Sequence, residues 1–315
     1  MASAKPDFAL PPQTLLHARY LLGDTLGGGA LGITYRAVQL DAPARGRVVA
    51  VKEFFPRALA VRAADGSVQP MPKGAADFAL YCARFVRGYR VLRAKADCPP
   101  LVPLLDLFEQ NGTAYVVMAY IEGETLEERV EAHGAIPPRA LMRMMRPFLH
   151  DLAALHRRQI IHRAIMPRNI LLRGENPPIL LDFGGARPED DWPLRRCPVL
   201  IGRGYLPPEQ ICQSRQGSWT DVYALCATMY YALTAKEPAD ALERLFAAET
   251  GKDDPLVPIR TLCPKLPRKQ ADALMAGLSL DSAARPADFA ALESALYGSK
   301  IPHFAFRIPN WHARK

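Results

Sequence analysis

The spacing of apolar residues changes along this 315-residue chain, and the change restricts the folds open to it. In the first third, short runs of β-branched and apolar residues predict strands, namely 34–40, 47–51, 101–108 and 113–118. The last two runs are separated by Asn111-Gly112, a strong hairpin signal. Between the two pairs of strands, apolar residues recur at helical spacing and predict one helix over 75–94.

From Gly123 onward, helical spacing dominates. The longest predicted helix, 138–158, carries its apolar residues on one face, namely Leu141, Met145, Phe148, Leu152 and Leu155. Further helices are expected near 221–235, 240–248, 269–278 and 286–296. The sequence therefore predicts a small β-rich lobe at 14–121 and a larger helical lobe at 122–297, with an N-terminal tail at 1–13 and a basic C-terminal tail at 298–315.

Composition excludes several classes of protein. No apolar run reaches the roughly 18 to 20 residues of a membrane span, and residues 1–13 lack the features of a secretory signal, so we expect a cytoplasmic protein. The six cysteines include no close pair, which argues against a zinc site and against a disulfide framework. The net charge of +8 is spread without a dense Lys/Arg run, so we expect no nucleic-acid partner.

A glycine-rich segment, Gly27-Gly28-Gly29-Ala30-Leu31-Gly32, lies within the strand-like stretch 20–51 and precedes the predicted strand 34–40. Glycines let the backbone approach phosphate oxygens and direct amide groups at them. In a dinucleotide-binding turn the last glycine would open a helix, whereas here the strand-like Ile33-Thr34-Tyr35 follows. The segment favours a glycine-rich hairpin over phosphates, although alone it also fits a merely flexible hairpin.

Three polar residues farther along suit the chemistry of nucleotide phosphates. Lys52 ends the apolar run 49–51 and can reach phosphates from beneath such a hairpin, the alternative being an edge lysine that reaches solvent. Asp182 follows the apolar run 179–181, and carboxylates are the usual protein ligands of phosphate-bound magnesium. Asn169 is a fitting second metal ligand.

This set of motifs, in this order and at these spacings, resembles the protein kinase family over residues 20–296. The segments 32–35, 52–56 and 207–210 are most similar to bacterial Ser/Thr kinases. The resemblance implies an α+β, bilobal protein-kinase-like fold with a small antiparallel β lobe, one main helix in that lobe, and a larger α-helical lobe. It also implies a buried ion pair between Glu209 and Arg285, and a role for Asp221 in holding the catalytic-loop backbone.

The resemblance further implies a site for ATP and magnesium. Met118 would be the gatekeeper, Ala119 to Ile121 the hinge that contacts adenine through its backbone, and Ala50 and Leu171 the residues on either side of the base. The expected cofactor-binding residues are Gly27, Gly28, Gly29, Gly32, Thr34, Ala50, Lys52, Met118, Ala119, Ile121, Leu171 and Asp182, with Asn169 and Asp182 as metal ligands.

The catalytic loop departs from the family pattern. The family reads H-R-D-x-K-P-x-N, whereas residues 162–169 read His-Arg-Ala-Ile-Met-Pro-Arg-Asn. By the resemblance, Ala164 replaces the aspartate that orients and deprotonates the substrate hydroxyl, and Met166 replaces the lysine that neutralises the moving phosphoryl group. Positioned acid–base groups contribute roughly 10² to 10⁴ in rate, and electrostatic stabilisers roughly 10² to 10³.

Two further positions lack their family residue. Gly202 stands where active Ser/Thr kinases carry a threonine bonded to this Asp and Lys, and Gly88 stands where the helix glutamate would pair with Lys52. Because no acid occurs between residues 78 and 96, Lys52 must find Asp182, a phosphate or water instead. The segment 185–206 contains no Ser or Thr, so its acidic run 189–191 is either a permanent partner of Arg163 or a solvated turn.

The sequence therefore predicts a catalytically impaired pseudokinase that binds ATP and magnesium and acts as a regulatory or scaffolding module. Its partner would be a protein, for example an active kinase or another signalling protein. Two enzymatic alternatives stay open. One is an active Ser/Thr protein kinase with an atypical catalytic loop. The other is nucleotidyl transfer on the same scaffold, with ATP bound in reverse and pyrophosphate released.

Overall fold

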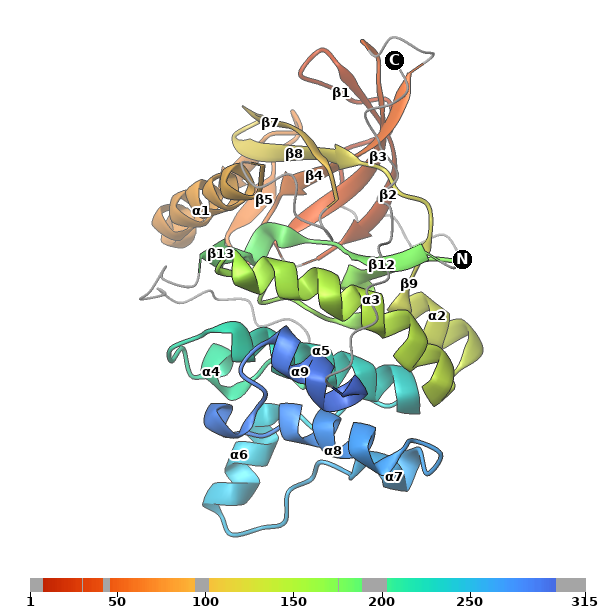
Figure 1. Cartoon of the computed structure of the whole chain (residues 1–315). Coiled ribbons are helices and arrows are strands. Elements are labelled where there is room, and N and C mark those ends of the chain that lie inside the picture. The colour runs from red at the N-terminus through yellow and green to blue at the C-terminus, as the bar shows by residue number, and fades with distance from the viewer. Residues whose placement is uncertain are drawn as a thin grey trace.

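The computed structural model describes residues 8–29, 31–41, 46–93, 102–174, 176–188 and 203–298. Figure 1 shows a strand-rich lobe stacked on a helical lobe, as the change in apolar spacing predicts. The smaller lobe is built on a six-stranded antiparallel sheet in the order β1-β2-β3-β4-β8-β7. The bounds of its strands are β1 Leu15–Leu16, β2 Tyr20–Gly28, β3 Gly32–Gln39, β4 Arg47–Phe54, β7 Leu104–Gln110 and β8 Thr113–Ala119.

The helix predicted over 75–94 is α1, Ala75–Arg93, and it packs against the sheet through its aromatic face. Phe54 of β4 contacts the rings of Phe78 and Phe85 at centroid distances of 5.5 and 5.3 Å. A two-stranded hairpin of β5 Ala60–Arg62 and β6 Val68–Pro70 stands apart from the sheet. Its turn signal, Asp65-Gly66, is visible in the sequence, but three-residue strands carry too little periodicity to be predicted.

Strand β4 is buried along both faces, because different elements cover each face. Side chains alternate across a strand, so Lys52 lies on one face and Glu53 on the other. Glu53 is fully buried, and its carboxylate accepts hydrogen bonds from Arg62 of the hairpin and from the hydroxyls of Tyr35 and Tyr115, both at 2.8 Å. This network joins the hairpin to the sheet.

The segment 8–14 lies against the same buried network. The Leu10 amide donates to the Tyr35 hydroxyl at 3.0 Å, and the Arg62 guanidinium donates to the carbonyl oxygen of Phe8 at 2.7 Å. Leu10 is buried, and the Phe8 ring stacks on Phe55. Residues 8–10, which the expected boundary at residue 13 places in a tail, therefore pack against the core of this lobe, whereas residues 11–13 are exposed.

The larger lobe contains the predicted helices α3 Pro138–Arg157, α5 Ser218–Thr234, α6 Ala241–Glu249, α8 Arg268–Gly277 and α9 Phe289–Tyr297, each within three residues of its expected bounds. Helix α5 is buried over most of its length and forms the centre of the lobe. Three shorter helices were not predicted: α2 Leu126–His133, α4 Pro208–Ile211 and α7 Ile259–Leu262. Among the described helices, none combines the length and the apolar character that a bilayer crossing requires.

Short strands at the junction of the lobes carry the loops of interest, namely β9 Glu124–Thr125, β10 Ile160–Ile161, β11 Ile170–Arg173, β12 Asn176–Leu180 and β13 Arg187–Pro188. Deeper in the helical lobe, the expected ion pair is confirmed. Arg285 donates to both oxygens of Glu209, at 2.7 and 3.1 Å, and the Thr220 hydroxyl donates to Glu209 at 2.9 Å. This buried pair anchors α4, which contains Glu209, to the lobe.

Candidate functional site

The glycine segment forms the hairpin that its sequence favours. Gly27 and Gly28 end β2 and pair with Thr34 and Ile33 of β3, and the Gly29 amide donates to the carbonyl oxygen of Gly32 at 2.8 Å. A Cβ at Gly32 would collide with the Glu53 carbonyl oxygen, so only glycine fits there. A Cβ at Gly27 or Gly29 would meet no heavy atom within 4 Å, which leaves room for a ligand along this backbone.

Lys52 forms an ion pair with Asp182, one of the three partners that the sequence leaves open to it. The Lys52 side chain is buried, whereas the Asp182 side chain keeps 40% of its surface exposed. The same carboxylate accepts a hydrogen bond from the Gly184 amide at 3.1 Å. Partial burial disfavours the ionised carboxylate, but Lys52 and the Gly184 amide outweigh that cost and hold the pKa of Asp182 below its usual range.

Helix α1 presents no carboxylate to Lys52. At Gly88, the position of the family's glutamate, an added Cβ would lie 3.4 Å from the carbonyl oxygen of Ala186. The next residue, Tyr89, is fully buried, and its hydroxyl has no hydrogen-bond partner in the described part of the chain. Burial, together with the negative charge of Asp182, raises the pKa of Tyr89 well above its usual value. The Tyr89 ring lies edge-on to Phe85, which lies beside Gly184.

The loop 162–169 shows the backbone contacts that the resemblance implies, although two of its side chains differ from the expected pattern. Asp221 of α5 accepts hydrogen bonds from the backbone amides of His162 and Arg163, both at 2.7 Å, which confirms its expected role. Arg163 adopts a positive φ of 67°, a conformation that non-glycine residues rarely adopt without such support. The Asn169 amide donates to the carbonyl oxygen of Ala164 at 2.8 Å and closes the loop.

At the two changed positions, the loop carries apolar groups. Ala164 offers a methyl group, and Met166 is buried in the core. His162 is also fully buried, with its ring edge-on to Phe183 at 4.6 Å, and burial lowers its pKa. It is a packed core residue, as the sequence reading favours, and does not serve as a base for a substrate hydroxyl.

Asp182 and Asn169 carry the side-chain oxygens that are expected to bind a metal ion. Carboxylate and amide oxygens are the donors that magnesium prefers, and magnesium usually completes its shell with phosphate oxygens and water. In residues 8–298, excluding the undescribed gaps, no group of three or more His, Cys, Asp or Glu side chains gathers to hold a metal. These residues fit an ion that arrives with a nucleotide better than an ion held by protein alone.

The residues expected around adenine come from three strands. Ala50 of β4 pairs with Met118 of β8, so these two side chains are neighbours in the sheet, and Leu171 is a buried residue of β11. The Ala119 amide donates to the carbonyl oxygen of Pro103 at 2.9 Å. Ile121 lies in the link between β8 and β9. The arrangement suits the expected adenine pocket but does not test it.

Several expectations fall on residues outside the described structure. Gly202 and the acidic run 189–191 lie there, so the partner proposed for Arg163 is not tested. The Arg163 guanidinium donates to the Gln216 side chain at 2.6 Å, a contact the sequence did not suggest. Tyr89 was also missed as a site residue, because its spacing along α1 identifies it only as core. The signal that could have found it is a tyrosine directly after the missing glutamate.

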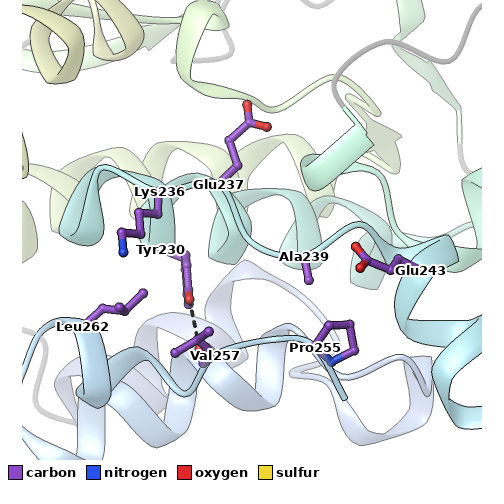
Figure 2. Close-up of a pocket in the computed structure, with 8 residues that line it drawn as sticks. All are labelled: Tyr230, Lys236, Glu237, Ala239, Glu243, Pro255, Val257 and Leu262. Carbon is purple, nitrogen blue, oxygen red and sulfur yellow. Dashed lines mark hydrogen bonds between the residues drawn. The ribbon is translucent and has the colours of Figure 1, made fainter. Parts of the chain in front are cut away.

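A hollow lies away from these residues. It has a volume of about 250 Å³ and is lined by residues of α5, α6, α7 and the segments between them, namely Tyr230, Lys236, Glu237, Ala239, Glu243, Pro255, Val257 and Leu262. Figure 2 shows the Tyr230 hydroxyl donating to the carbonyl oxygen of Val257, at 2.9 Å. None of the sequence-predicted site residues lines it, so the glycine hairpin and its surroundings remain the candidate site.

Comparisons with known proteins match most of the chain, including the residues of the candidate site. A family model described as "Protein kinase domain" matches residues 20–254. Serine/threonine-protein kinase PknA of Nostoc sp. is 30% identical over 236 residues, which cover 72% of this chain and 39% of PknA. Serine/threonine-protein kinase pkn2 of Myxococcus xanthus is 31% identical over 307 residues, 94% of this chain and 34% of pkn2.

The solved structure titled "PpkA-294 apo form" has a TM-score of 0.76 and 26% identity, and the match covers 92% of this chain and all of that one. Of the first three distinct relatives, PknA, PknL and pkn2, the chain spans between about a third and a half of their length.

Proposed function

Because the chain belongs to the protein kinase family and resembles its bacterial Ser/Thr members, we propose that it is a pseudokinase, a nucleotide-binding module with impaired phosphoryl transfer. Its role would be regulatory or scaffolding, exerted through contact with a protein partner such as an active kinase. The observation that carries the proposal is the catalytic loop, whose backbone is held in place around two apolar side chains, Ala164 and Met166.

The argument for impaired transfer is chemical. A methyl group at Ala164 neither accepts a proton nor orients a hydroxyl, and the Met166 thioether carries no charge with which to stabilise a migrating phosphoryl group. With typical contributions of roughly 10² to 10⁴ for a positioned base and roughly 10² to 10³ for an electrostatic stabiliser, the combined loss spans at least about four orders of magnitude if the effects multiply.

The argument for nucleotide binding rests on what is retained. The glycine hairpin has an open backbone, Lys52 supplies a positive charge beneath it, and Asp182 and Asn169 supply oxygen ligands. When bound, magnesium would screen the phosphate charges. Lys52 would leave Asp182 and turn to the phosphates, and Asp182 would then be free to bind the ion.

A titration of thermal stability with MgATP tests this part of the proposal. A ligand that binds only the folded state stabilises it by about 2.7 kcal/mol at one hundred times its dissociation constant. We expect the melting temperature to rise progressively with MgATP, and the rise to be much reduced in Asp182→Asn, which keeps the size of the side chain but not its charge. No rise at millimolar MgATP would exclude nucleotide binding.

An active Ser/Thr kinase is the second candidate, because the relatives are named as such kinases. Phosphoryl transfer depends strongly on positioning and metal charge, so slow transfer without the aspartate is chemically conceivable. Transfer of the γ-phosphoryl group to a protein, abolished in Asp182→Ala, would favour this candidate. Release of pyrophosphate in place of ADP would instead favour nucleotidyl transfer.

A further inference from the structure

Tyr89 of α1 is a buried polar side chain that the proposed function does not yet use. It is 1% exposed, and its hydroxyl has no hydrogen-bond partner among the described residues. Buried hydroxyls in folded proteins nearly always have a partner, and an unpaired one costs free energy. A tyrosine held in this state at a candidate site points to a partner that is present only in another state of the site.

The surroundings of Tyr89 identify that partner. Its ring lies edge-on to Phe85, at a centroid distance of 4.9 Å. Phe85 in turn lies against Gly184, where an added Cβ would be 3.8 Å from the Phe85 ring and 3.2 Å from the Asp182 carboxylate. The Asp182 charge acts on the Tyr89 phenol. Tyr89, Phe85 and the segment after Asp182 thus form one contiguous cluster.

Two groups bond to the Asp182 carboxylate, namely Lys52 and the Gly184 amide, and both bond to the same oxygen. The Tyr89 side chain belongs to the adjoining cluster through the Phe85 ring, which lies beside Gly184. Its buried O–H has no described acceptor. If a nucleotide draws Lys52 away, the carboxylate loses the hydrogen-bond donor that carries a full charge, and the Tyr89 phenol is a neutral donor in the adjoining cluster that could replace it.

We propose that Tyr89 is a positioning residue for nucleotide binding. Its hydroxyl donates a hydrogen bond to the Asp182 carboxylate when Lys52 turns to the phosphates. Tyr89 therefore compensates for the glutamate that is missing at Gly88. In this chain α1 would hold the Asp182 carboxylate directly through Tyr89, so that Lys52 would need no carboxylate on α1. The inference rests on the proposed nucleotide binding, since a loaded site is what separates Lys52 from Asp182.

The variant Tyr89→Phe removes only the hydroxyl and tests this role. Because that hydroxyl is unpaired in the unloaded protein, we expect the melting temperature without nucleotide to stay the same or to rise. With nucleotide we expect the opposite effect, a dissociation constant for MgATP raised about tenfold in calorimetric titration, as befits a lost hydrogen bond to a charged group. A side chain with only a packing role would not weaken nucleotide binding.

Tyr115→Phe is the matched control. The Tyr115 hydroxyl is buried in the same lobe but bonds to Glu53 on the opposite face of β4, at 2.8 Å. This control should lower the melting temperature without nucleotide and leave the MgATP affinity unchanged.

The outcomes distinguish this inference from the function on which it rests. If the unmodified chain binds MgATP and Tyr89→Phe binds it equally well, the positioning role is overturned and nucleotide binding stands. The role is also overturned if both tyrosine variants lose affinity to the same extent. If the unmodified chain binds no nucleotide, both the proposed function and this inference fall.

Discussion

At the scale of single residues, the catalytic loop is held by backbone contacts from Asp221 and Asn169 but carries apolar side chains at Ala164 and Met166. Asp221, Asn169 and the positive φ of Arg163 fix the loop backbone. Of the four positions at which the chain lacks the expected family residue, Ala164 and Met166 lie in this loop, and Gly88 and Gly202 lie outside it. The loop is therefore a scaffold into which the missing groups can be reintroduced.

The double variant Ala164→Asp with Met166→Lys should gain phosphoryl transfer. We expect the rate of transfer from MgATP to a generic protein substrate to rise at least about 10²-fold, because a positioned base alone contributes that much. The matched control, Ala164→Asn with Met166→Lys, restores size and polarity without a base and should stay near the starting rate. Equal rates in the two double variants would contradict this reading of the loop.

The role of Glu53 as a buried ion-pair partner was not predicted from the sequence. Glu53 follows Lys52 on β4, where apolar neighbours such as Val51 and Phe54 leave both faces of the strand buried. A carboxylate there must be buried and paired. Its partner, Arg62, lies in the next strand, β5, which belongs to a separate hairpin. No spacing pattern in the sequence connects the two residues. Long-range ion pairs of this kind are set by packing and not by spacing.

Replacing Glu53 by Gln should destabilise the small lobe strongly. The substitution leaves the Arg62 charge buried without a counter-charge, and breaking a buried pair in this way typically costs about 3 to 5 kcal/mol. Urea denaturation measures the loss. Glu249→Gln, an exposed change on α6, is the control and should have an effect below about 0.5 kcal/mol. A loss at Glu53 as small as this would mean that Arg62 finds another partner.

At the scale of elements, strongly periodic segments were predicted well and short or charged ones were not. Helices α1, α3, α5, α6, α8 and α9 and the main strands of the sheet follow their apolar spacing. Helix α2 was missed because Leu126 and Val130 are its only buried residues. Its start is fixed by a capping box in which Thr125 and Glu128 satisfy each other's amides.

The segment before β1 shows the same limit. Residues 8–13 lack regular structure and read as a tail, yet they cover the outer face of the sheet. A chain without periodicity can still be core, since burial depends on which surface it meets. The glycine hairpin was easier to place, because the strand-like residues after Gly32 exclude a helix.

The buried side chain of Leu10 allows a test of this segment. We expect Leu10→Ala to lower the free energy of unfolding by about 2 to 4 kcal/mol, the usual cost of truncating a buried leucine. Leu15→Ala is the matched control, since Leu15 is 47% exposed, and it should cost well under half as much. Equal losses in chemical denaturation would show that residues 8–13 add little to the lobe.

At the scale of the whole molecule, the proposed nucleotide site draws on both lobes. The glycine hairpin and Lys52 belong to the small lobe, and Asn169, Leu171 and Asp182 belong to the large one. The ion pair between Lys52 and Asp182 joins them without a ligand. These residues and their order could be predicted from the sequence. The packing of Tyr89 against Phe85, beside Gly184, could not, because it depends on how α1 packs.

The most direct test of the account measures binding and transfer on one preparation of the chain. With radiolabelled MgATP, we predict saturable binding and no label transferred to protein above the background of Asp182→Ala. Transfer at an ordinary kinase turnover of about 1 to 100 per second, abolished by Asp182→Ala, would contradict the claim that this family member has lost its phosphotransfer chemistry.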